Sequence, residues 1–302
     1  MIESTRVKNL TVPVGKIDVL LDTDAHNEID DQYAIAYLLK SKEKLNTIAL
    51  YAAPYSRAGS GTVGEGMQRS YDEIVKVLDL MGENVPVFKG AESYLPDEET
   101  PVISPAALDL ANRANSYSPE KPLFVVAIGA ITNIASAILL NPKVAENTVV
   151  VWLGGHAYHY GDSVEFNLKQ DIAAARVVFG CGVPLVQLPC CGVVSSFAIS
   201  KPEIEKWLIG KNELTDYLAK ITIAHVEEYV KIPTWSKPIW DVTAVAWLLN
   251  DGERFMKSRL VTTPKPSYDG YYTVIPGNHL SNYVYYINRD ELLLDLIEKL
   301  TK

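Results

Sequence analysis

Short apolar runs recur along the chain and alternate with stretches of helical periodicity. The runs are rich in Val and Ile and lack polar alternation, which is typical of strands buried on both faces of a parallel sheet. They predict strands at residues 19–21, 47–53, 123–130, 148–155 and 183–189. Helices are predicted between them at 30–41, 70–82, 132–142 and 171–182. This order predicts an α/β fold with an open, mainly parallel twisted sheet flanked by helices, in which ligands bind beyond the carboxyl ends of the strands.

The pattern changes after about residue 200, where the chain becomes mainly helical. Predicted helices at 201–210, 213–231 and 241–250 give a helical C-terminal half. Residues 271–300 have the pattern of a hairpin followed by a helix. Because no repeat, low-complexity tract or linker interrupts the sequence, we expect residues 1–302 to form a single domain.

Composition narrows the class of protein. The chain has 302 residues, 48% of them hydrophobic, and a formal net charge of −9, which describes a soluble globular protein that repels nucleic acid phosphates. No apolar stretch approaches the roughly 18 residues of a membrane span, and the N-terminus lacks the apolar core of a signal peptide. We therefore expect a cytoplasmic protein without a membrane partner. Its three cysteines do not predict a disulfide framework.

Four aspartates follow the first predicted strand: Asp22, Asp24, Asp30 and Asp31. So many like charges at one strand end need a counter-ion, and this density of oxygen ligands suits Ca²⁺ or Mg²⁺ better than zinc. Helix capping is the alternative, because acidic residues in a first helical turn are favoured by the helix dipole. Capping accounts for Asp30 and Asp31 but leaves the other two unexplained. A metal or sugar site is the favoured hypothesis.

Five segments, in this order, resemble the inosine–uridine-preferring ribonucleoside hydrolases. They are DTD (22–24) with the DD (30–31) that opens a helix, AIGAITNIA (127–135), WLGG (152–155), VEFNLKQD (164–171) and WDVTAVAWLL (240–249). The resemblance implies a nucleoside hydrolase fold, a bound Ca²⁺, and hydrolysis of the N-glycosidic bond of a ribonucleoside to ribose and free base. We also expect a homodimer or homotetramer.

The resemblance implies roles for individual residues. Asp24 would be a calcium ligand and the general base that takes a proton from the attacking water. The other protein ligands would be Asp31, the backbone carbonyl of Ile128, and Asp241. The residues that would hold the ribose hydroxyls are Asp30, Glu165 and Asn167. An oxocarbenium-like transition state needs such a water-activating centre beside polar groups that fix the sugar.

The sequence departs from the family pattern around the substrate pocket. AHNEI (25–29) replaces a Pro-Gly turn and is two residues longer, so we expect a reshaped ribose pocket. AAPYSR (52–57) stands where the family has a Gly-Asn pair, so one ribose contact is missing or replaced. Residues 93–113 do not match the family's Gly-rich stretch. The resemblance therefore implies least about the residues that recognise the base.

The predictions about the nucleobase rest on Trp240 and His225. Many family members have His immediately before the last calcium ligand, whereas some purine-preferring members resemble this chain in having Trp there. An indole offers a stacking face without a titratable proton, which favours purines. Its apolar neighbours Ile239 and Val242 leave a core role open. His225 shares a helix face with Tyr229 and is a candidate leaving-group acid, with a surface pair as the alternative.

Two other functions remain open. LDTDAHNE resembles the start of haloacid-dehalogenase-type phosphatases, but His26 stands where that class has Thr or Val. A nucleoside-binding relative without activity is the other alternative, although every carboxylate of the calcium set is present. GSGTVG (59–64) fits a dinucleotide-binding GxGxxG, yet PYSRA separates it from the preceding strand, which favours a loop at the mouth of the site.

Overall fold

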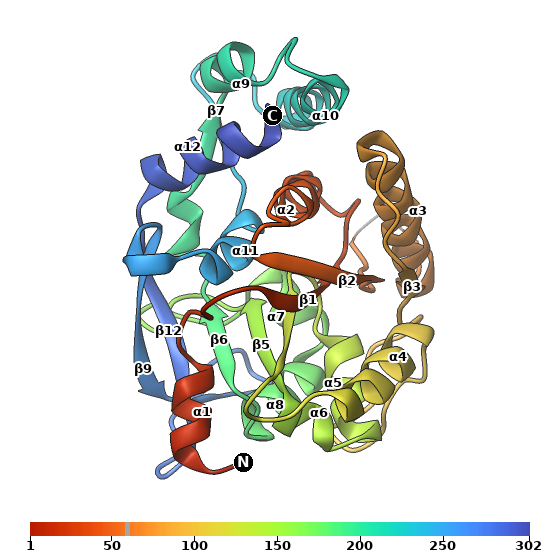
Figure 1. Cartoon of the computed structure of the whole chain (residues 1–302), viewed down its shortest axis with the longest axis vertical. Coiled ribbons are helices and arrows are strands. Elements are labelled where there is room, and N and C mark those ends of the chain that lie inside the picture. The colour runs from red at the N-terminus through yellow and green to blue at the C-terminus, as the bar shows by residue number, and fades with distance from the viewer. Residues whose placement is uncertain (58–60) are drawn as a thin grey trace.

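The computed structural model describes residues 1–57 and 61–302. Its centre is a sheet in which these residues contribute eight strands, in the order β3, β2, β1, β4, β5, β6, β12, β9 (Figure 1). In that order the strands span Val87–Lys89, Leu45–Ala52, Ile17–Thr23, Leu123–Ala127, Thr148–Leu153, Leu185–Leu188, Leu280–Ile287 and Met256–Thr262. Every pairing in the described sheet is parallel except that of β12 with β9. The predicted open, mainly parallel sheet is confirmed.

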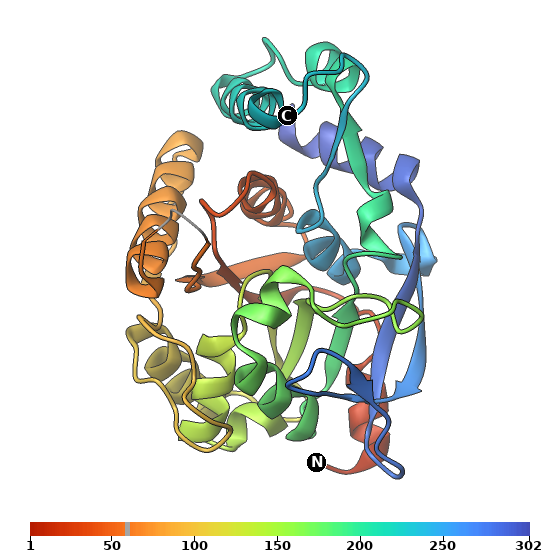
Figure 2. The same ribbon diagram turned by 180° about the vertical axis from the view of Figure 1, so that it is seen from behind.

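Helices cover both faces of this sheet, as the two opposite views show (Figures 1 and 2). Val19 and Leu21 of β1 face a core shared with α2, α11 and α12, whereas Leu20 faces a second core shared with α4, α5, α6 and α8. Because successive side chains point to opposite faces, β1 is apolar throughout its centre. The helices span Glu3–Asn9 (α1), Asp30–Leu39 (α2), Val63–Met81 (α3), Pro105–Arg113 (α4), Thr132–Leu140 (α5), Lys143–Asn147 (α6), Phe166–Gln170 (α7), Ile172–Gly180 (α8), Lys201–Trp207 (α9), Glu213–Tyr229 (α10), Val242–Leu248 (α11) and Arg289–Leu300 (α12).

The strand order reverses at β1, which has β2 on one side and β4 on the other. The crevice at the carboxyl ends of these strands is the expected ligand site of an open α/β sheet. The two strand ends are tied together because the Ile128 amide donates to the Asp22 carbonyl at 2.9 Å. None of the helices in the described residues is long and apolar enough to cross a membrane.

The predicted hairpin at 271–287 is wrong. Tyr272–Thr273 (β11) pairs with Lys265–Pro266 (β10), and β12 enters the main sheet between β6 and β9. A two-stranded ribbon is marginally stable in water, whereas β12 gains two neighbours and a helix-covered face. Up to Leu248 the C-terminal region is mainly helical, as predicted, with a short pair formed by β7 (Ala198–Ser200) and β8 (Ser236–Pro238).

Helix α3 begins before the segment predicted for it. Thr62 and Glu65 form a capping box, in which each side chain accepts a hydrogen bond from the other residue's backbone amide. Val63 and Gly64 therefore start a helix, and the loop predicted for 59–64 is wrong for these two residues. The Gly59 and Ser60 of that segment lie outside the described residues.

Candidate active site

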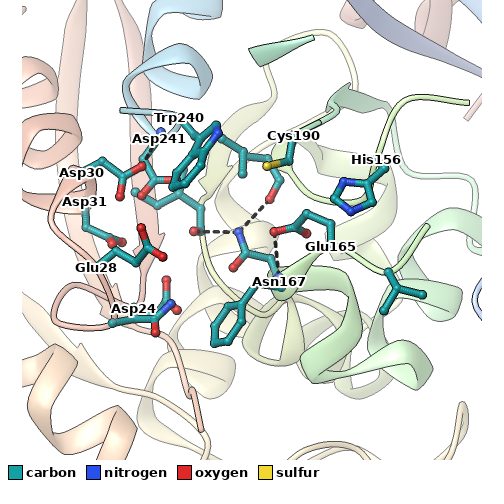
Figure 3. Close-up of a pocket in the computed structure, with 15 residues that line it drawn as sticks. Asp24, Glu28, Asp30, Asp31, His156, Glu165, Asn167, Cys190, Trp240 and Asp241 are labelled. Atoms are coloured by element: carbon teal, nitrogen blue, oxygen red, sulfur yellow. Dashed lines mark hydrogen bonds between the residues drawn. The ribbon is translucent and has the colours of Figure 1, made fainter. Parts of the chain in front are cut away.

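The four predicted metal ligands, and Asp30, which was predicted to hold the ribose, come from separate segments that meet beyond the carboxyl ends of β1 and β4 (Figure 3). Asp24 follows β1 and Ile128 follows β4, while Asp30 and Asp31 form the first turn of α2. Asp241 immediately precedes α11, and its amide donates to Oδ2 of Asp30 at 3.3 Å across 211 positions. All five residues line one pocket.

The closest carboxylates are those of Asp30, Asp31 and Asp241, each of which offers an oxygen within 4.8 Å of the others. All three are at most 5% exposed. Asp24 lines the same pocket, and its buried Oδ2 has no hydrogen-bond partner in the described part of the chain. An ionised buried oxygen without a donor is costly. This all-oxygen set fits a cation of the calcium type, which Asp24, Asp31, Asp241 and the Ile128 carbonyl would hold.

Burial raises the pKa of these carboxyl groups, and their mutual repulsion adds to the effect. Burial, and to a smaller extent the charge of Asp30, raises the pKa of Asp31 to about 8. Burial also raises the pKa of Asp30 to about 6, although the nearby Lys237 ammonium opposes this. The pKa values of Asp24 and Asp241 are raised well above the usual range, chiefly by burial. A dication would favour the ionised forms that burial opposes.

These shifts predict that the chelated protein becomes more stable as the pH is lowered from about 8 to about 5. The folded pKa values, about 6 for Asp30 and about 8 for Asp31, exceed the ordinary value of 3.8, so the folded state binds more protons than the unfolded state. This stability is present at low pH and is lost as the pH rises through the folded pKa values. Calorimetry in chelator measures the melting temperature. Asp31→Asn should flatten the upper part of the profile, and a melting temperature that rises with pH in this window would contradict the prediction.

Asp22 lies beneath the pocket, where its carboxylate joins the end of β1 to α5. Its Oδ1 accepts a hydrogen bond from Nδ2 of Asn133 at 2.8 Å, and Oδ1 of Asn133 accepts from the Ala91 amide at 2.8 Å. Burial raises the pKa of Asp22 to about 7. Asp22 is not among the residues that line the pocket.

Gly129 allows the loop after β4 to approach Asp24. A Cβ at this position would lie 2.9 Å from Oδ1 of Asp24 and 2.9 Å from the Cβ of Ala53. We expect Gly129→Ala to displace the Asp24 carboxylate, weaken divalent cation binding and cost about 1–3 kcal/mol of stability, as overpacking usually does. Titration calorimetry with Ca²⁺ and a melting curve measure the two effects. Gly161→Ala is the control, because a Cβ there meets nothing within 4 Å. A folded Gly129→Ala protein with unaltered cation affinity would refute this reading.

Glu165 and Asn167 form the wall opposite the aspartates (Figure 3). The Glu165 carboxylate caps α7 and accepts hydrogen bonds from the amides of Asn167, Leu168 and Gly155 at 2.9 to 3.0 Å. Burial nevertheless raises the pKa of Glu165 to about 7. Nδ2 of Asn167 donates to the Ile128 carbonyl at 3.0 Å. Since a carbonyl oxygen has two lone pairs, Ile128 keeps one for another ligand.

The structure places Trp240 between the core and the pocket. It is partly buried against the core and also lines the pocket. Lys237 Nζ lies 4.2 Å from its ring centroid and is paired with Glu28. Glu28 and Asn27, both in the longer AHNEI segment, line the pocket as well. Sequence reasoning did not select Glu28 or Lys237, because their pairing joins positions 209 residues apart.

His225 lies on α10 and lines a neighbouring hollow rather than the acidic pocket, with Asn27 and Glu28 bordering both. Burial lowers the pKa of His225, and Lys237 lowers it further, so the imidazole is neutral near pH 7. Its role toward the base stays a prediction. His156 and Cys190, for which the sequence predicted no role, also line the acidic pocket. The available signal was their position, just after β5 and β6 respectively.

The mainly parallel α/β sheet thus carries a buried acidic pocket beyond the carboxyl ends of β1 and β4. The family model described as inosine-uridine preferring nucleoside hydrolase matches residues 19–279, and the chain belongs to this family. It is accordingly an N-ribosyl hydrolase by family.

The relatives differ in the base that their names specify. The chain is 28% identical over 261 residues to the pyrimidine-specific ribonucleoside hydrolase RihA of Citrobacter koseri, covering 77% of this chain and 79% of the relative. It is 26% identical over 225 residues to a probable uridine nucleosidase 2 of Arabidopsis thaliana, covering 67% and 68%. The solved structure of a purine-preferring ribonucleoside hydrolase from Gardnerella vaginalis matches with a TM-score of 0.76 at 18% identity, covering 94% and 98%. A plant nucleoside hydrolase matches with a TM-score of 0.75 at 20% identity, covering 94% and 99%. These two structures support the fold.

Proposed function

We propose that the protein uses Ca²⁺ to hydrolyse the N-glycosidic bond of a ribonucleoside, with release of ribose and free base. The observation that carries the proposal is the buried Asp24 oxygen, which faces the pocket without a partner among the described residues. Asp31 and Asp241 border the same space, and Glu165 and Asn167 form the opposite wall. The pocket thus combines a cation-binding side with a polar side suited to a sugar.

Asp24 is the general base in this proposal. Its carboxylate takes a proton from the water whose oxygen attacks C1′, and the base departs with the electron pair of the broken bond and takes up a proton from solvent or a neighbouring group. Glu165 and Asp30 accept hydrogen bonds from ribose hydroxyls, and Asn167 holds a further hydroxyl. These contacts fix the ring while positive charge develops on it, and the nearby carboxylates favour that charge. Calcium, when bound, supplies the positive charge that lowers the pKa of a water molecule.

A panel of ribonucleosides tests the proposal, with and without chelator, by measuring free ribose and free base. Calcium-dependent release of both products from at least one ribonucleoside is the expected result. The panel includes p-nitrophenyl phosphate, because its turnover would favour the phosphatase alternative. Tight nucleoside binding without base release would support the inactive binding protein instead.

We propose purine preference on the basis of Trp240. Its indole lines the pocket and offers a stacking face, and stacking on an aromatic side chain is worth about 1–3 kcal/mol per base, or roughly one to two decades. We expect kcat/KM for inosine or guanosine to exceed that for uridine, and Trp240→Ala to narrow the gap. Trp207→Ala is the control, since Trp207 is 43% exposed on α9. Faster hydrolysis of uridine than of inosine by the unaltered protein would overturn the preference and leave the activity in place.

We also propose that residues 1–302 act as one domain in a cytoplasmic homodimer or homotetramer. Support for assembly comes from apolar side chains exposed near the β9 edge of the sheet, where Leu260 is 45% and Tyr286 51% exposed. Light scattering on the purified protein measures the state of assembly.

A further inference from the structure

His156, Cys190 and Cys191 form a second cluster of ligand-type side chains. A ring nitrogen of the histidine and the two sulfur atoms lie within 4.8 Å of one another. His156 follows β5 and the cysteine pair follows β6, its neighbour in the sheet. His156 and Cys190 line the pocket on the side away from the aspartates (Figure 3). The cluster therefore borders the candidate active site from its opposite wall.

The backbone holds the two segments in place independently of any ligand. The Cys190 amide donates to the Gly155 carbonyl at 2.8 Å, and the Ala157 amide donates to the Cys191 carbonyl at 3.0 Å. Gly192 follows with φ of 91°, and a Cβ there would lie 2.8 Å from the Cβ of Ala157. A glycine is needed for both the close approach and the left-handed conformation. Backbone contacts therefore hold together the two segments that carry the three side chains.

The ring of His156 lies between the cysteine pair and Asp162. Its Nδ1 accepts a long hydrogen bond from the Cys191 amide, at 3.4 Å, and a cation bound at Nδ1 would replace this contact. Its Nε2 lies 4.0 Å from Oδ1 of Asp162. Histidine ligands commonly direct their second ring nitrogen at a carboxylate, which fixes the ring and raises its basicity.

The donor types distinguish this wall from the acidic one. Two thiols and an imidazole suit zinc or cadmium, whereas the oxygen set across the pocket suits calcium. Zinc sites with three protein ligands keep a fourth position for water or substrate. Here that position faces the pocket, because Cys190 and His156 both line it.

We propose that His156, Cys190 and Cys191 bind one thiophilic divalent cation of the zinc type, and that its binding blocks the substrate pocket. Both thiols lose their protons to solvent, and no group changes oxidation state. Blocking follows from position and charge, because Glu165, which is proposed to hold a ribose hydroxyl, lines the same pocket as His156 and Cys190. The metal site goes beyond the proposed function, and only the blocking effect rests on it.

The binding test titrates Zn²⁺ and Cd²⁺ into reduced, calcium-saturated protein, so that the oxygen site is already filled. Calorimetry gives the stoichiometry, and thiolate-to-cadmium charge-transfer absorption reports sulfur ligation. We expect one equivalent to bind, with affinity at least about tenfold weaker in Cys191→Ser and His156→Gln. Cys181→Ser and His159→Gln are the matched controls and should bind as the unaltered protein does. Thermal melting shows that each variant is folded.

Two results would overturn the site: no zinc or cadmium binding by the unaltered protein, or equal binding by folded Cys191→Ser. The blocking effect is read from nucleoside hydrolysis with and without one equivalent of zinc. Inhibition that Cys191→Ser relieves supports it, because Cys191 lies outside the residues that line the pocket, and binding without inhibition overturns it. If zinc binds as expected and no nucleoside is hydrolysed under any condition, the proposed function fails while the metal site stands.

Discussion

Asp24→Ala is expected to lower kcat for the true substrate by at least about three orders of magnitude while the protein stays folded. Loss of a general base alone costs about 10²- to 10⁴-fold. The substitution also removes a carboxylate from the predicted calcium set, so the cation and the water would both be held less well. Asp24 is 2% exposed and its Oδ2 has no partner in the described residues, so little of the fold depends on it. Initial rates of base release, with circular dichroism as a check of folding, measure the effect.

Asp24→Asn separates the loss of the general base from the loss of a calcium ligand. The amide keeps an oxygen of nearly the same shape for the cation but cannot take a proton, so calcium binding should survive better than turnover. Asp72→Ala, on the exposed side of α3, controls for the loss of one negative charge. If Asp24→Ala or Asp24→Asn kept near-normal kcat, Asp24 could not be the base.

The strands near the site could be predicted because a strand that is buried on both faces needs apolar residues at every position, which gives a continuous apolar run in the sequence. β1, β2, β4, β5 and β6 all carry that signal. The hairpin prediction failed for β12, because the sequence shows that a segment is extended but not which distant strand it pairs with. The start of α3 was missed because glycines suggested a loop, whereas the Thr62 and Glu65 capping box stabilises a helix there.

The acidic half of the site could be predicted for a related reason. Asp22, Asp24, Asp30 and Asp31 stand close together in sequence, and a cluster of like charges after a buried strand demands an explanation. The other wall is different, because His156 and Cys190 come from the ends of β5 and β6 and become neighbours only through the parallel pairing of those strands. Glu28 and Lys237 likewise meet only in the fold. Such contacts leave no local pattern to detect.

Removal of divalent cations is expected to abolish nucleoside hydrolysis, and calcium is expected to restore it. The reason lies in the buried carboxyl groups. Burial, and then the charge of Asp31, raises the pKa of Asp24 and so disfavours the ionised form that acts as a base, whereas a bound cation favours that form. Chelation therefore removes the charge that activates the water and also the charge that favours the ionised form of Asp24. Full activity in chelator, with no metal detected in the protein, would contradict both the cofactor and the mechanism.

Asp241→Asn extends this prediction to a single ligand. Asp241 is 5% exposed, and one of its carboxylate oxygens lies within 4.8 Å of oxygens of Asp30 and Asp31. Loss of one charge from this set should raise the calcium concentration for half-maximal activity by at least about tenfold, since calcium affinity depends on the number of charged ligands. Saturating calcium should recover much of the kcat, because Asp24 remains in place to take the proton. Asp295→Asn, on α12 and away from the pocket, is the control, because its carboxylate pairs with Tyr37 and Arg254 instead. An unchanged calcium requirement in Asp241→Asn would exclude this carboxylate as a ligand and would leave Asp24, Asp31 and the Ile128 carbonyl to hold the ion.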